Sequence, residues 1–261
     1  MEVRLDGKVA LITGGSMGMG KAMAQKFAAS GAEVAIVARR PEPLADTARE
    51  IVAAGGRCRA YAGDVSKADE INRLFSAINA DLGRVDILVN NAGRSQAGKF
   101  EELTDEIWQG DFDLKVFAAV RFARLAFPGM KSRRWGRIIN VLNIGAKAPG
   151  PGSAPTTVMR AAGMALTKVL AGEGAPYNVL VNCLMTGLIV SDQWARRHRS
   201  VAPQQPFEEF LAEQAKAQRL PMGRFGTAEE FANIACFLAS DAASYISGTA
   251  INVDGARSPV V

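Results

Sequence analysis

The chain has 261 residues, of which 48% are hydrophobic and 22% are charged. This composition excludes an intrinsically disordered chain, and the length suits one large domain over residues 1–261. No apolar run reaches the length of a spanning helix, so we expect no membrane partner and a cytoplasmic location. The net charge of +5 is spread along the chain, which argues against a nucleic-acid surface.

Cysteine and histidine usage limits the chemistry further. Cys58, Cys183 and Cys236 lie far apart among apolar or small residues, which predicts free, buried thiols and no metal site. His198 is the only histidine, and this argues against a Ser-His-Asp triad or a histidine-rich metal centre.

Short apolar runs alternate with longer segments of helical periodicity. The predicted strands are Val9–Ile12, Val34–Val37, Arg57–Tyr61, Ile87–Val89, Arg137–Val141, Val179–Cys183 and Ala250–Val253. The predicted helices begin near Gly18, Pro41, Ser66, Thr104, Pro155 and Thr227, with N-caps at Ser66 and Thr227. This alternation is typical of an α/β protein with a parallel sheet covered on both faces, here of seven strands.

Residues 191–226 interrupt the alternation and are rich in Gln, Pro and Arg, which predicts a substrate lid. Its larger apolar side chains either form a cover over the substrate or pack into a core, which is the more frequent role for such residues; they are Trp194, Phe207, Phe210 and Leu211. The basic run from Arg196 to Arg199 is either a solvated helix face or a cationic rim for an acidic substrate. The sequence therefore favours a medium-sized apolar molecule with an acid group as the small-molecule substrate.

The first predicted strand leads directly into a glycine-rich turn, Thr13–Gly20, and then into a helix. Gly14 permits a tight turn, Gly18 lets the backbone approach a pyrophosphate, and Gly20 lets helix and strand pack closely. The N–H groups at the helix start would face the phosphates. The segment therefore predicts a dinucleotide-binding site.

The end of the second strand indicates which dinucleotide is bound. An acid there would bind the ribose 2′-hydroxyl, but the sequence is Val37-Ala38-Arg39-Arg40. Arg39 is suited to a 2′-phosphate, so NADP is favoured over NAD. In the alternative, Arg39 lies in solvent and either cofactor is accepted.

Several motifs together resemble the short-chain dehydrogenase/reductase (SDR) family. They are Thr-Gly-x-x-x-Gly-x-Gly at 13–20, Asp64 after the third strand and Asn90-Asn91-Ala92-Gly93 after the fourth, and the similarity continues to Ile251–Gly255. The resemblance implies a Rossmann-type doubly wound fold and a homotetramer packed through helices 104–130 and 155–172. It also implies cofactor contacts from Gly14, Ser16, Met17, Gly18, Met19, Arg39, Asp64, Val65, Asn91, Ala92, Gly93, Arg160 and Ile189.

The same resemblance places the family's catalytic Asn, Ser, Tyr and Lys on Asp113, Asn143, Thr156 and Arg160, and all four are replaced. Thr156 lacks the acidity of a phenol, and Arg160 stays protonated, although it could polarise a carbonyl. Asn143 could donate an N–H to a substrate oxygen. We expect Asp113 to lie near Arg160, either as a proton source or only as its ion-pair partner.

Three functions are consistent with these replacements. The first is an NADP-dependent carbonyl reductase or alcohol dehydrogenase that takes its proton from water, Asp113 or the substrate. The second is a lyase, hydratase or dehalogenase in which Asn143, Thr156 and Arg160 polarise a substrate without hydride transfer. The third is a cofactor-binding protein without catalysis. The intact glycine turn favours the first and the third.

Overall fold

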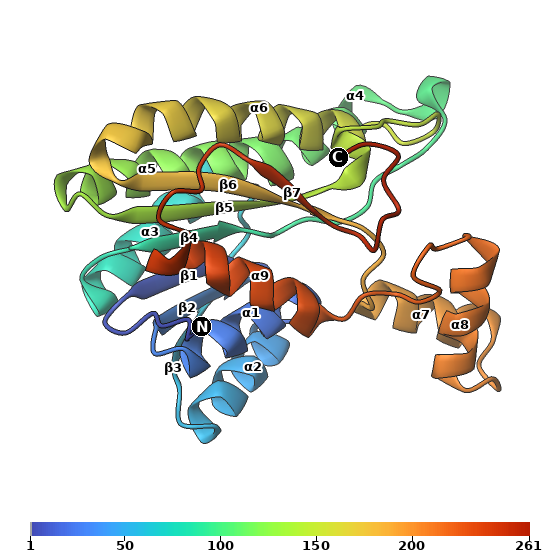
Figure 1. Ribbon diagram of the computed structural model, residues 1–261, viewed down its shortest axis with the longest axis horizontal. Coiled ribbons are helices and arrows are strands. Elements are labelled where there is room, and N and C mark those ends of the chain that lie inside the picture. Colours follow the sequence, from blue (N-terminus) through green and yellow to red (C-terminus); the bar gives the residue numbers. More distant parts are fainter. Residues whose placement is uncertain (1) are drawn as a thin grey trace.

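A seven-stranded parallel sheet lies between two layers of helices (Figure 1) in the computed structural model, which describes residues 2–261. The strand order is β3-β2-β1-β4-β5-β6-β7. The strands are β1 (Val9–Thr13), β2 (Glu33–Ala38), β3 (Arg57–Ala62), β4 (Ile87–Asn90), β5 (Gly136–Asn143), β6 (Val179–Thr186) and β7 (Ala250–Val253). The predicted Rossmann-type fold is confirmed, and the order reverses between β1 and β4, where such sheets bind ligands.

Helices cover both faces of the sheet. They are α1 (Gly18–Ala29), α2 (Pro41–Ala53), α3 (Ala68–Leu82), α4 (Asp105–Phe112), α5 (Ala118–Ser132), α6 (Thr156–Gly174), α7 (Asp192–Val201), α8 (Phe207–Ala217) and α9 (Ala228–Ala239). One apolar core joins α1, α2 and α9 to the sheet, and the other joins α3, α5 and α6 to its opposite face. No helix within residues 2–261 is long and apolar enough to cross a membrane.

The predicted cap at Thr227 is present, and the predicted helix start at Thr104 also carries a side-chain cap. The Thr104 hydroxyl accepts a hydrogen bond from the N–H of Ile107, and Thr227 forms a reciprocal capping box with Glu230. The predicted cap at Ser66 is wrong, because α3 begins at Ala68. Ser66 instead donates from both its N–H and its hydroxyl to the carboxylate of Asp64.

The long helix predicted over residues 104–130 is interrupted. A five-residue π-helical turn, Asp113–Phe117, separates α4 from α5. A π turn holds more residues than an α turn, so the side chains after it lie on a different face from the one that regular helical spacing predicts. This shift decides which residue of the segment faces the active site.

The predicted lid contains α7 and α8, which project beside the sheet layers (Figure 1, orange). The Trp194 ring packs edge-on against Phe225 at 4.8 Å, and the His198 ring lies 5.2 Å from both Phe207 and Phe210. The expected apolar cover is therefore wrong in detail, because these rings pack against one another and form a small core inside the lid.

The core on the α5 face should respond strongly to truncation. Phe122 is fully buried there, and we expect Phe122→Ala to lower the free energy of unfolding by about 3–5 kcal/mol because it removes a ring and leaves a cavity. The matched control is Phe100→Ala, since Phe100 is 75% exposed and its loss should change stability by less than about 0.5 kcal/mol. Urea unfolding followed by circular dichroism measures both, and equal effects would contradict this packing.

Candidate active site

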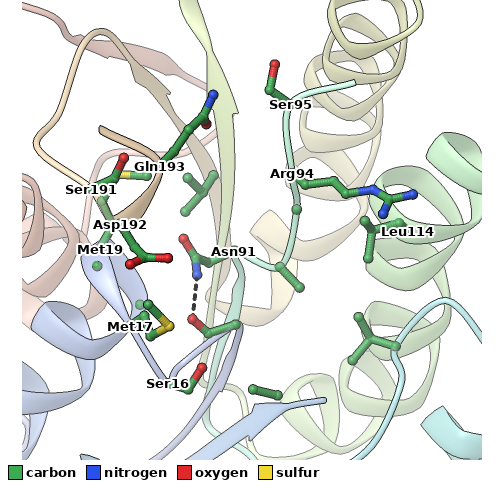
Figure 2. Close-up of a pocket in the computed structure, with 18 of the residues that line it drawn as sticks. Ser16, Met17, Met19, Asn91, Arg94, Ser95, Leu114, Ser191, Asp192 and Gln193 are labelled. Atoms are coloured by element: carbon green, nitrogen blue, oxygen red, sulfur yellow. Dashed lines mark hydrogen bonds between the residues drawn. The ribbon is translucent and has the colours of Figure 1, made fainter. Parts of the chain in front are cut away.

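A cleft of about 940 Å³ opens at the carboxyl ends of the strands. It begins at Arg39 and Arg40, after β2, and reaches Thr156 and Arg160 at the start of α6. Figure 2 shows the glycine turn and lid residues on one side and Arg94 with Leu114 on the other. The structure thus brings most of the predicted site residues, from distant parts of the chain, into one continuous cavity.

The glycine turn leaves the first turn of α1 open to this cleft. Met17, the N-cap residue, makes no side-chain hydrogen bond to the helix. Gly18 has a φ of +52°, and a Cβ there would meet no atom within 4 Å. At Gly20 a Cβ would lie 2.0 Å from the carbonyl oxygen of Gly14, so only glycine allows this close approach. These free N–H groups and the open space fit a pyrophosphate.

Asn91 fixes the position of the glycine turn. Its Nδ2 donates to the carbonyl oxygens of Thr13 at 2.9 Å and Gly14 at 3.2 Å, and Figure 2 draws one hydrogen bond of this amide as a dashed line. The backbone N–H groups of Asn91 and Ala92 both donate to Thr13 Oγ1 at 3.0 Å. Asn91 to Gly93 line the cleft as predicted. The side-chain amide of Asn91, however, is hydrogen-bonded to the backbone of the glycine turn and stabilises it.

The far end of the cleft carries the residues expected to hold the adenosine. Arg39, Asp64 and Val65 line it together with Arg40. Arg39 is exposed and makes no hydrogen bond or ion pair within residues 2–261, so its guanidinium is free for a ligand. Burial alone would raise the pKa of the Asp64 carboxyl, but hydrogen bonds from Ser66 and the charge of Arg39 hold it below its ordinary value.

At the other end, Asn143, Thr156 and Arg160 line the cleft where the family resemblance places them. The Oδ1 atom of Asn143 is buried and has no hydrogen-bond partner in the described part of the chain. Arg160 donates from Nη1 to the carbonyl oxygen of Val141 at 2.6 Å, and its buried Nε also lacks a partner. Burial lowers the pKa of Arg160 to about 10. These polar atoms are available to a bound molecule.

The predicted pairing of Asp113 with Arg160 is wrong. Asp113 accepts hydrogen bonds from Gln109 at 3.0 Å and from Arg121 at 3.5 Å, on the outer side of the helix. The π turn brings Lys115 to the active-site side instead. Lys115 Nζ donates to Thr156 Oγ1 at 2.8 Å and forms an ion pair with Asp111, which lies one helical turn earlier.

Lys115 and Asp111 are both buried, with side chains only 1% exposed. Burial lowers the pKa of Lys115 to about 8, although the Asp111 carboxylate opposes this change. The positive charges of Arg160 and Arg94 contribute to this lowering. A buried lysine whose pKa is lowered toward neutrality, directly behind a cleft of this kind, is a functional-site signal that the sequence did not reveal. The i,i+4 spacing of Asp111 and Lys115 was the signal available in the sequence.

The lid presents polar side chains to the cleft, namely Ser191, Asp192, Gln193 and Arg196 (Figure 2 labels the first three). Arg196 forms an ion pair with Asp192, whereas Arg197 lies over the ring of Trp194. The basic run is therefore only in part a rim of the cleft. Ile189 is buried against Gly226 and does not line the cavity, so its side chain is not placed for the expected contact with the cofactor.

Comparisons with known proteins agree with this architecture. Residues 14–256 match the family described as Enoyl-(Acyl carrier protein) reductase. The chain is 35% identical to the oxidoreductase YvrD of Bacillus subtilis over 98% of both chains, and 33% identical to the 3-oxoacyl-[acyl-carrier-protein] reductase FabG of Aquifex aeolicus over 98% of this chain and 99% of FabG.

Among solved structures, L-sorbose reductase from Gluconobacter frateurii, in complex with NADPH and L-sorbose, superposes with a TM-score of 0.94. It is 36% identical, and the match covers 100% of both chains. This NADPH complex supports the sequence-based choice of NADP as the cofactor. Because the similarity extends over the whole fold and the glycine turn, this chain belongs to the short-chain dehydrogenase/reductase family.

Proposed function

We propose that this protein is an NADP(H)-dependent oxidoreductase that interconverts a carbonyl compound and an alcohol at a site without the family's usual catalytic side chains. One observation carries the proposal. A single cleft joins an open dinucleotide cradle, at Ser16 to Met19, to the polar groups of Asn143, Thr156 and Arg160.

The residues of the cleft fit NADP(H). The free N–H groups of the α1 start would hold the pyrophosphate, and Arg39 would pair with the 2′-phosphate. Asp64 and Val65 would contact the adenine, and Arg160 would lie beside the nicotinamide ribose. When bound, the nicotinamide supplies or accepts the hydride.

The polar groups at the reaction end would handle the substrate oxygen. Asn143 offers its amide to the carbonyl, and the charge of Arg160 stabilises the negative charge that develops on the oxygen. Thr156 takes the position that a more acidic phenol holds in the family, so reduction of generic carbonyl compounds should be slow.

The charge of the cleft favours an acidic substrate. Arg94, Arg160 and Arg196 line its reaction end and lid side, and Asp192 is the acid that partners Arg196. A carboxylate on the substrate would be attracted by the two guanidinium groups that have no acidic partner at hydrogen-bond distance. The expectation that the substrate is also apolar loses its support, because the aromatic rings of the lid pack against one another.

Three further parts of the proposal concern the assembly, the location and the lid of the protein. A homotetramer is supported by the outer surface of α6, where Val158 and Val169 are 49% and 56% exposed. A cytoplasmic location is supported by the three cysteines, which are all free thiols. Residues 191–226 would act as the lid, because their polar side chains reach over the cleft.

Cofactor choice gives the first test of this proposal. Arg39→Ala should weaken NADPH binding roughly 10- to 100-fold, the loss of about 1.5–3 kcal/mol for a hydrogen bond between charged groups, and should leave NADH binding nearly unchanged. Isothermal titration calorimetry measures both affinities. The control is Arg49→Ala, which removes an exposed arginine of α2 that pairs with Asp46. Equal affinities of the native protein for the two cofactors would refute the proposed role of Arg39.

The reaction itself is tested by mixing the protein with NADPH and a panel of aldehydes, ketones and oxo acids. Absorbance at 340 nm reports NADPH oxidation, and chromatography reports substrate loss in parallel. We expect slow oxidation that matches alcohol formation, and Arg160→Met should lower kcat/KM by about 10²–10³-fold, as expected for loss of a charge that stabilises the transition state. Arg49→Met should leave kcat/KM unchanged.

Each other outcome of this assay favours a different function. Substrate loss without NADPH oxidation would indicate a non-redox reaction on this fold. NADPH binding without any substrate loss would indicate a cofactor-binding protein, and either result would overturn the proposed oxidoreductase activity.

The oligomeric state is tested by light scattering at micromolar concentration. We expect a mass about four times the 27.7 kDa of one chain. Val169→Glu should reduce it, because it places a charge on the exposed surface of α6, whereas Val52→Glu on α2 should not. A monomeric native protein would contradict this assembly.

A further inference from the structure

Lys115 is held at the back of the active site by two side chains. Its Nζ donates to Thr156 Oγ1 at 2.8 Å and pairs with the carboxylate of Asp111. Thr156 and Arg160 line the main cleft, whereas Lys115 lines only a small cavity behind it, of about 10 Å³. The Thr156 hydroxyl is therefore the hydrogen-bonded link between the Lys115 ammonium and the cleft.

The remaining hydrogen bonds of Thr156 determine how this link works. Its Oγ1 accepts from the N–H of Gln96 at 2.9 Å and donates to the carbonyl oxygen of Gln96 at 2.7 Å. Both lone pairs are thus occupied by donors, Gln96 and Lys115, and the hydroxyl hydrogen can only point to an acceptor. A substrate oxygen in the cleft would compete with the Gln96 carbonyl for that hydrogen.

The charges around Lys115 favour release of its proton. Arg160 on α6 and Arg94 on the loop after β4 are cationic, and Asp111 on α4 is the one acid in contact. Arg160 cannot act as an acid near neutral pH, since its pKa is about 10 even when lowered by burial. Lys115, whose pKa burial lowers to about 8, is protonated at neutral pH and can still give up a proton.

We propose that Lys115, acting through the hydroxyl of Thr156, supplies the proton that completes carbonyl reduction in this protein. As hydride reaches the carbonyl carbon, the substrate oxygen takes the Thr156 hydroxyl hydrogen, and Oγ1 takes a proton from Lys115 Nζ. The C=O bond becomes C–O–H, Thr156 remains a hydroxyl, and Lys115 becomes a neutral amine beside Asp111. After the alcohol leaves, water in the cleft returns one proton through the same hydroxyl. The inference rests on the oxidoreductase function proposed above.

Kinetics of NADPH-dependent reduction provide the test, with a carbonyl compound from the panel that the native protein reduces. The kcat should be constant near neutral pH and fall as pH rises through about 8, because only protonated Lys115 donates. Lys115→Met should lower kcat by about 10²–10⁴-fold and remove this pH dependence. Lys131→Met on α5 is the control, and it should change neither.

Removing charges next to Lys115 should shift the descending limb of the pH profile of kcat, and the direction should depend on the sign of the charge removed. Asp111→Asn removes the carboxylate that raises the pKa of Lys115, so the limb should shift to lower pH. Arg94→Gln removes a charge that lowers this pKa, so the limb should shift to higher pH. A purely structural Lys115 would give no such pair of shifts. Thr156→Val should lower kcat below that of the native protein, as Lys115→Met does, while Thr156→Ser restores it, and both leave the Lys115–Asp111 pair in place.

A second readout needs neither cofactor nor turnover. Lysine labelled with ¹³C at Cε gives one NMR signal per lysine, and the signal lost in Lys115→Met identifies this residue. We expect it to titrate near pH 8, well below the other lysines. A midpoint near the ordinary lysine value of about 10.5 would overturn the inference.

The two proposals fail in different ways. Absence of any NADPH-dependent reduction by the native protein would overturn the oxidoreductase function, and with it the relay. Reduction that persists in Lys115→Met with an unchanged pH profile would overturn the relay alone.

Discussion

The hydroxyl of Thr13 at the end of β1 is the contact on which the site depends. It accepts hydrogen bonds from the N–H groups of Asn91 and Ala92 and donates to the carbonyl oxygen of Val89, so it ties the ends of β1 and β4 together. The sheet order reverses between these two strands, and the resulting crevice is where a doubly wound fold binds its ligand. The side chain of Asn91 then hydrogen-bonds to the backbone of the glycine turn, so the turn and the reaction end of the cleft lie at the same edge of the sheet.

Much of the fold was predictable because its signals are local. The strands β1, β2, β4, β5 and β6 are largely apolar runs that are buried on both faces of the sheet, as with Ala10 to Ile12 of β1, whereas the edge strand β3 is mostly exposed. The glycine turn was predictable for the same reason, since turn, close approach and helix start are encoded within eight residues. Predictions that needed contacts between distant segments were weaker. The aromatic residues of the lid were assigned to the cleft because sequence does not show that Trp194 packs against Phe225.

The site beyond the cradle was predicted only in part. Asn143, Thr156 and Arg160 lie in the cleft, where family spacing placed them. Asp113 does not, because the π turn from Asp113 to Phe117 shifts the helical phase and brings Lys115 inward. A π turn has no clear sequence pattern, and its presence depends on how α4 and α5 pack against the rest of the domain. The pairing of Asp113 with Arg121 follows from that same change of phase.

In the proposed reaction, the two buried cations of the reaction end would divide the work that one lysine and one tyrosine share in the resembling enzymes. Arg160, whose pKa is about 10, keeps its charge near neutral pH, so it would stabilise a developing alkoxide without neutralising it. Lys115 would neutralise it, provided that it is protonated when the substrate binds. Burial and two neighbouring arginines lower its pKa, and the Asp111 carboxylate opposes this change. The buried Oδ2 of Asp111 has no partner, so the side-chain hydrogen bonding of Asp111 in residues 2–261 is all directed at Lys115. Asp111 therefore holds Lys115 in the charged state that a proton donor requires.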